Sequence, residues 1–154
     1  MSDNLSERKS FEALTSDFAN DPVVCQMKQF THHGKTTTYQ HCQMVAERSL
    51  SFSRYFKMNV DEEALVRAAF LHDLFLYDWH GYDHPRPHGF LHAEIACQNA
   101  MKTFDLSSKE QNIIRSHMWP LTITKLPKSK EAFIVCLMDK WCAFSETIHR
   151  WKSK

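Results

Sequence analysis

Histidine and aspartate residues in the middle of this sequence have side chains that bind metal ions. His72 is followed directly by Asp73, and His117 and Asp139 lie further along the chain. Burying a carboxylate without a partner costs free energy or forces the group to become neutral, and a shared cation removes that cost. Histidine nitrogen and carboxylate oxygen are common ligands of zinc, iron and manganese. The adjacent pair can supply two ligands from one helical turn, and the Asp73 carboxylate can bridge two ions.

Separate helices are expected to position these side chains. Apolar residues at steps of three and four predict a long amphipathic helix over residues 38–57, with His41 one turn before Val45. His72 and His117 lie on the apolar stripes of two further helices, and the last aspartate lies beside the stripe of the final one. The expected helices cover residues 6–19, 22–30, 38–57, 62–77, 88–104, 108–119 and 129–151.

The remaining local signals also favour helices. Asp61 is a good N-cap, and Ser107 with Glu110 has the pattern of a capping box. The only strand candidate is the short run from Leu121 to Thr124, and residues 78–89 form a loop rich in aromatic and histidine side chains. We therefore predict an all-α fold, a helical bundle of six to seven helices.

Length, charge and cysteine content exclude several classes of protein. A chain of 154 residues is the size of one domain, and its net charge of +1 provides no basic field for nucleic acid or an anionic membrane. The five cysteines form no C-x-x-C pair, which favours reduced thiols and a cytoplasmic location. Neither a signal peptide nor a run of about 18 apolar residues is present, so we expect no membrane span.

The order and context of the polar residues resemble the HD-domain metal-dependent phosphohydrolases. Members of that superfamily are all-α, and they carry ligands in the order H, HD, H, H, D when two metals are bound. The matching segments are Tyr-Gln-His41-Cys-Gln-Met, Phe-Leu-His72-Asp73-Leu, His88-Gly-Phe-Leu-His92-Ala-Glu, Ile-Arg-Ser-His117-Met and Leu-Met-Asp139-Lys. The resemblance covers roughly residues 35–144, the expected metal-binding core of a single HD domain over 1–154, with residues 1–33 as an N-terminal helical segment.

A set of six metal ligands, and two ions of iron, manganese, zinc or cobalt, is implied by the resemblance. The ligands are His41, His72, Asp73, His88, His117 and Asp139. His88 is preferred as the third ligand because the family's histidine usually precedes a pair of small residues by four positions. His92 then stands where a small residue is usual, and it is kept as the alternative ligand or as a residue that touches substrate.

The mechanism that the resemblance implies is hydrolysis of a phosphomonoester or phosphodiester by metal-activated hydroxide. Asp73 and His72 are the expected catalytic residues. Substrate binding is assigned to His92, Lys140, Arg48 and Trp119: the two cations can neutralise phosphate and the indole can stack on a nucleobase. The favoured substrate is a nucleotide or dinucleotide.

Two other functions are compatible with the same residues. Relatives of this fold use the H, HD, H, H, D set to hold mixed-valence di-iron for oxygenation, and a metal-bound domain can bind a nucleotide without turnover. Spare aromatic residues on the last predicted helix, such as Trp141, Phe144 and Trp151, also leave a homodimer open.

Overall fold

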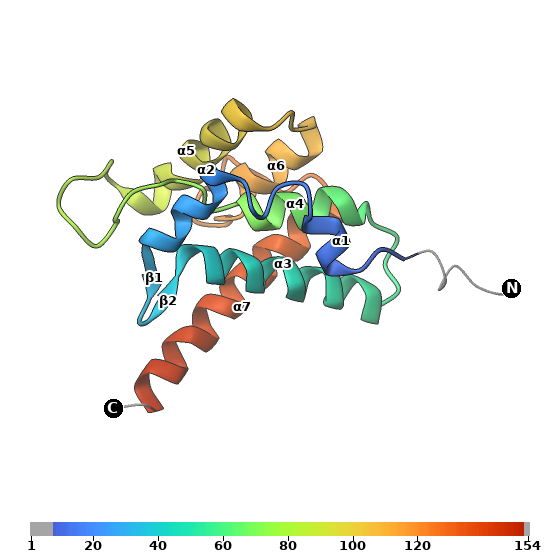
Figure 1. Cartoon of the computed structure of the whole chain (residues 1–154), viewed down its shortest axis with the longest axis horizontal. Helices are drawn as coiled ribbons and strands as arrows, with labels where there is room; N and C mark the ends of the chain where they lie inside the picture. Colours follow the sequence, from blue (N-terminus) through green and yellow to red (C-terminus); the bar gives the residue numbers. More distant parts are fainter. Residues whose placement is uncertain (1–7, 153–154) are drawn as a thin grey trace, which may run out of the picture.

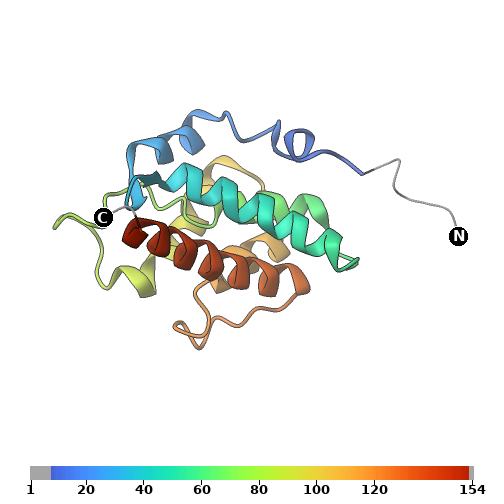
Figure 2. The ribbon, with the colours of Figure 1, turned by 90° about the horizontal axis from the view of Figure 1, so that it is seen from below.

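Two long helices lie side by side through the middle of the molecule and run in opposite directions. In the computed structural model, which describes residues 8–152, α3 (Thr38–Tyr55) and α7 (Lys130–Lys152) form this pair (Figure 2). α4 (Glu62–Leu71) packs on both, α6 (Ser108–Ser116) packs on α4 and α7, and α5 (His88–Thr103) packs mainly on α6. The prediction of an all-α fold is confirmed.

Side-chain caps fix where the central helices begin. Thr37 and Gln40 form a capping box at the start of α3, and the Asp61 carboxylate accepts a hydrogen bond from the backbone N–H of Ala64 at the start of α4. The predicted capping box of Ser107 and Glu110 opens α6. These contacts satisfy backbone N–H groups that have no partner inside the helix.

The N-terminal elements cover one side of α3 and α4. α1 (Phe11–Thr15), α2 (Pro22–Cys25) and the 3-10 helix η1 (Gln26–Gln29) lie along these helices (Figure 1). The ring of Phe18 contacts that of Phe70 edge to face, with centroids 5.5 Å apart. The core beneath is apolar and fully buried at Val45, Leu65 and Ile113.

A short hairpin stands where the sequence suggested only a break between helices. β1 (Thr31–His33) pairs antiparallel with β2 (Thr36–Thr37) across Gly34, whose φ of 62° suits glycine. Residues 121–124, the predicted strand, form turns instead, because no neighbouring segment pairs with them. The first predicted helix is shortened to α1, and its expected start at Ser6 lies outside the described residues.

The helix that carries the His-Asp doublet ends earlier than predicted. α4 stops at Leu71 instead of near Tyr77, His72 occupies its C-cap, and residues 72–75 form turns. The side-chain amide of Asn99 on α5 donates to the freed carbonyl of Leu74 at 2.9 Å. Neighbours on a regular helix point about 100° apart, so this early end is what allows the two side chains of the doublet to face one site.

No helix in the described part of the chain has the length and apolar character needed to cross a membrane.

Candidate metal centre

Four side chains from three elements meet at one point in the core. His41 comes from α3, His72 and Asp73 from the end of α4, and Asp139 from α7. The Nε2 atoms of His41 and His72 lie 2.9 and 3.2 Å from Asp139 Oδ1. The same two nitrogens lie 3.9 and 3.4 Å from Asp73 Oδ2. These ligand atoms are close enough to share one cation, and we call them the first group.

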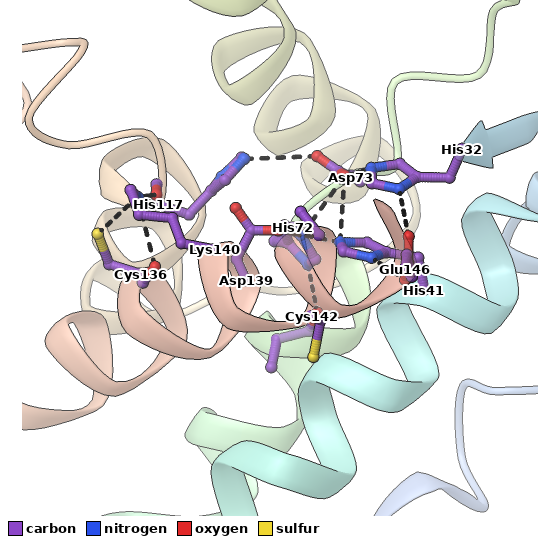
Figure 3. A network of polar contacts seen from close by, with 12 residues as sticks. His32, His41, His72, Asp73, His117, Cys136, Asp139, Lys140, Cys142 and Glu146 are labelled. Carbon is purple, nitrogen blue, oxygen red and sulfur yellow. Dashed lines mark hydrogen bonds and ion pairs between the residues drawn. The ribbon is translucent and has the colours of Figure 1, made fainter. Parts of the chain in front are cut away.

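A second group uses the other oxygen of the same carboxylate. The Nε2 atoms of His92 and His117 lie 3.3 and 3.4 Å from Asp73 Oδ1, and they lie 2.9 Å from each other. In Figure 3, His117 lies to the left of Asp73, and His41 lies to its right. The two oxygens of Asp73 thus face two different sets of ligands, which is the geometry of a bridging carboxylate.

The hydrogen bonds of three imidazoles fix which nitrogen faces the site. The Nδ1 atoms of His72, His92 and His117 lie 2.6–2.9 Å from backbone carbonyl oxygens one turn earlier. A carbonyl oxygen only accepts, so each Nδ1 carries a hydrogen, and in the neutral form of each ring the Nε2 presents a lone pair. The Nε2 atoms of His92 and His117 lie 2.9 Å apart, and two lone pairs at that distance repel. Only a second proton or a cation between the two nitrogens makes this contact favourable.

Two further observations favour a cation. Burial lowers the pKa of His117, which leaves its Nε2 unprotonated at neutral pH despite the nearby Asp73. Asp73 Oδ1 is buried and receives no well-aligned hydrogen bond from the described residues. Buried acceptors of this kind are normally satisfied, so the donor set fits divalent metal ions.

Both aspartates are held in the charged form. Burial opposes the charge of Asp73, but His72 and the other imidazoles outweigh it and keep its pKa well below the usual value. Burial acts on Asp139 in the same way, and hydrogen bonds from His41 and His72 keep its pKa low. Ionised carboxylates are the form in which aspartate binds metal.

Two residues that the sequence reasoning missed also belong to this cluster. His32 lies on β1 and Glu146 on α7, and they form a metal-capable group with His41. Glu146 stands seven residues after Asp139, two helical turns on the same face, so that spacing was a usable signal. His32 lies in the unpredicted hairpin, and the sequence carried no comparable signal for it.

The preference for His88 as the third ligand is not supported by the geometry. The Nδ1 of His88 contacts the hydroxyl of Tyr77 at 2.8 Å, and its ring stacks on those of Trp79 and His92. His92 lies one turn later on α5 and points to Asp73 instead. The structure therefore brings the alternative, His92, into the second group.

A cavity of about 260 Å³ opens onto both groups. His88 and Trp79 form part of its wall, and Lys140 lies at its edge. The ammonium of Lys140 donates to the carbonyl of His117 at 2.9 Å, so phosphate would compete with that contact.

The structure gives the other two predicted substrate-binding residues no part in this cavity. Arg48 lines a separate groove beside Trp141, and Trp119 packs on Phe133 in an apolar surface depression. Arg48 and Trp119 therefore lie in two other depressions, and neither lines the cavity beside the metal ligands.

Comparison with protein families decides what this arrangement is. A family model described as HD domain matches residues 38–143, which is more than half of the chain. The chain belongs to the HD domain family. This HD domain is thereby placed in the metal-dependent phosphohydrolase superfamily, as the resemblance indicated. All residues of the first and second groups fall inside the match. Searches of curated proteins and of solved structures found no match.

Proposed function

We propose that this HD domain hydrolyses a phosphate ester at a centre of two divalent ions. The observation that carries the proposal is Asp73, whose two oxygens face two separate sets of ligands. A bound pair of ions lowers the pKa of a coordinated water and polarises the phosphoryl oxygens.

The protein side chains have distinct tasks in this proposal. Asp73 would hold one ion with each oxygen, and the carbonyl contacts of His72, His92 and His117 would hold their Nε2 atoms toward Asp73 as ligands. Burial, and next the nearby His92, lower the pKa of His88 to about 4. His88 is therefore neutral at the cavity wall, and it does not draw the phosphate of a substrate away from the metal ions. Asp73, His92 and His117 are buried where they line the cavity, and a site that holds little water strengthens electrostatic stabilisation of the transition state.

Nucleotides are the proposed substrate class, and the size of the cavity favours a mononucleotide over a dinucleotide. Its volume of about 260 Å³ is below the roughly 300–1,000 Å³ of sites that enclose drug-sized ligands. The rings of Trp79 and His88, stacked on each other with centroids 5.2 Å apart, form an aromatic surface at one wall. A phosphate group at the ions would leave the rest of a small substrate against that surface.

The test is phosphate release from a panel of substrates by the metal-loaded chain. The panel contains nucleoside monophosphates, a dinucleotide and a small sugar phosphate, and it is run with manganese, cobalt, zinc and iron in turn. Asp73→Asn and Glu131→Gln are purified in parallel, since a contaminating phosphatase would act equally in both. Release that requires metal and Asp73 supports the proposal; equal release by Asp73→Asn, or none from any ester, contradicts it.

Di-iron oxygenation is the second candidate, and the second group favours it. Asp73, His92 and His117 supply two histidines and one carboxylate, a set that non-haem iron oxygenases use to hold one iron, and the first group would hold the other. Oxygen consumption measured with iron-loaded protein, and again with the manganese form, separates the two functions. Turnover that needs both iron and oxygen would favour oxygenation, whereas hydrolysis should proceed without oxygen and with several divalent ions.

A further inference from the structure

Two buried side chains from outside the family match contact the first group of ligands. His32 precedes residues 38–143 and Glu146 follows them, yet both lie against His41, and His32 also contacts Asp73 (Figure 3). The hairpin β1–β2 brings one of them in, and the C-terminal turns of α7 bring the other. This part of the site is therefore supplied by the segments on either side of the matched region.

Glu146 gives His41 a hydrogen-bond partner of a different kind from those of the other ligands. The Nδ1–H of His41 donates to Glu146 Oε1 at 2.8 Å, whereas the Nδ1 atoms of His72, His92 and His117 face backbone carbonyls. A carboxylate partner fixes the ring with Nε2 toward the metal and makes that nitrogen a stronger electron donor. The contact therefore acts on the first group and not on the second.

His32 closes a ring of contacts around the same ligands. It stacks on His41 with centroids 3.7 Å apart and an angle of 16° between the rings. Its Nδ1 lies 3.3 Å from Glu146 Oε2, and its Nε2 lies 3.3 Å from Asp73 Oδ2. His32 thus links the carboxylate that orients His41 to the carboxylate oxygen that belongs to the first group.

We propose that Glu146 and His32 are positioning residues that set the affinity of the first metal site. Glu146 holds His41 with its Nε2 toward the ion, and His32 holds Asp73 Oδ2 in place beside it. The second site uses His92, His117 and the other oxygen of Asp73, none of which Glu146 or His32 contacts directly, so its affinity should change less. This inference rests on the proposed two-ion centre and specifies what distinguishes its two sites.

The test is a titration of the metal-free full chain with manganese or cobalt in competition with a chelator. Glu146→Gln and His32→Phe keep the approximate shape of each side chain and remove the polar contacts. Partners that orient a metal ligand typically contribute about 10–100-fold to affinity, so the tighter binding step should weaken by that factor in each variant. Repeating the titration in the His92→Ala chain, which lacks a second-site ligand, assigns the weakened step to the first site.

Glu131→Gln is the matched control. Glu131 is a buried carboxylate on the same helix, and it accepts hydrogen bonds from the backbone of Asp61 and from Lys109, far from the metal ligands. This control should lower stability and leave both metal affinities unchanged. Unchanged metal affinities in Glu146→Gln and His32→Phe, or a loss shared equally by Glu131→Gln, would overturn the inference. A wild-type chain that binds no metal would refute the two-ion function itself.

A second, independent inference concerns the outer face of α7. Large apolar side chains between 37% and 80% exposed recur there at steps of four and three, namely Leu137, Trp141, Phe144, Ile148 and Trp151. This is the spacing of a heptad seam. The opposite face of the same helix is buried at Val135, Asp139 and Cys142, so α7 is apolar on two sides, which is typical of a helix buried on both.

We propose that a second copy of this chain covers the seam, with the two α7 helices packed antiparallel about a two-fold axis. A large apolar side chain that is about half exposed has roughly 100 Å² of its surface in contact with solvent. The five in the seam, together with Phe133, would then bury roughly 1,200 Å² over the two copies, which exceeds the roughly 1,000 Å² expected of a specific interface. A groove of about 600 Å³ beside Leu137 and Trp141, lined on its far side by Arg48 and Phe52, can receive side chains of the partner.

Sedimentation equilibrium of the full chain at micromolar concentration tests this interface. The wild type should be a dimer, and the double variant Trp141→Glu, Phe144→Glu should be a monomer with unchanged metal content. Tyr82→Glu, at a 92% exposed position in the loop between α4 and α5, is the control and should remain a dimer. A monomeric wild type, a double variant that still dimerises, or binding of the seam to anionic vesicles in place of self-association would refute the proposal.

Discussion

The two histidines at the start of α5 give the sharpest test of the metal centre. His92 Nε2 is one of three ligand atoms in the second group, and truncation to alanine removes it. Even residues that only orient a ligand contribute about 10–100-fold to affinity, so loss of the ligand itself should weaken the second site by at least about 100-fold, or about 2.7 kcal/mol.

The variant His88→Ala should keep its affinity for the second ion, although His88 lies only one helical turn before His92. The contribution of His88 to the second group is its backbone carbonyl, which accepts the Nδ1–H of His92 at 2.9 Å and survives the substitution. What is lost is a stacked ring with its centroid 4.5 Å from that of His92. We expect less than about a threefold change in affinity for the second ion.

Elemental analysis and stepwise titration with manganese measure both effects. The wild type and His88→Ala should hold two ions per chain, and His92→Ala should hold one. Release of the second ion by His88→Ala, with retention by His92→Ala, would refute the reasoning from hydrogen-bond geometry and restore the ligand chosen from sequence.

Three further outcomes follow from the contacts described above. Asp73→Asn should lose both ions and all hydrolysis, because one oxygen of Asp73 serves each group; two ions retained in elemental analysis would exclude a bridging role. Saturation of one site with metal at about 100 times its Kd stabilises the fold by about 2.7 kcal/mol. Chelation of the two ions should therefore lower Tm by at least roughly 5–11 °C for a domain of this size, and an unchanged Tm in calorimetry would contradict a metal-linked core. Glu110 is buried and paired with Arg67 at 2.6 Å, and Glu110→Ala should cost about 2–4 kcal/mol in urea denaturation. Burial opposes the charge of Glu110, but hydrogen bonds from Arg67 and Ser107 lower its pKa, so this stability is present above about pH 4.3, the usual pKa in the unfolded chain, and is lost as the pH falls through the lowered value. A difference between wild type and variant that persists at lower pH would contradict this linkage.

Local patterns in the sequence were sufficient to predict the helices and several of their ends. Spacing of apolar residues located α3, α5 and α7 to within two or three residues, and the caps at Asp61 and Ser107 lie where expected. The end of α4 was not predictable from its own residues, since the segment from Phe70 to Tyr77 contains no glycine or proline. Contacts from α5, such as that of Asn99 with Leu74, stabilise the early turn. Tertiary structure therefore overrode local propensity at the residues that form the site.

The choice between His88 and His92 shows the limit of arguing from spacing alone. Residues four apart share a helix face, so both were compatible with a ligand role on α5. Which of them reaches Asp73 depends on how α5 packs against α6. That packing brings His92, and not His88, next to His117 at the end of α6. His32 was beyond sequence reasoning for the same reason, since only the hairpin brings it to Asp73.

The negative charge of the buried carboxylates has to be balanced, either by protons on the nearby histidines or by metal ions. Asp73, Asp139 and Glu146 bring three carboxylates into one cluster of five imidazoles. In the metal-free protein, protons compensate: burial opposes the charge of His32, but hydrogen bonds to Asp73 and Glu146 raise its pKa to about 9, and His72, also opposed by burial, has a pKa well above its usual value because of Asp73. Divalent cations would balance the carboxylates while every ligand imidazole stays neutral. His32 is not a ligand and keeps its proton between Asp73 and Glu146. Metal binding therefore has to displace the proton of His72, and the cluster is stable as a protonated network or as a metal centre but not as bare ligands.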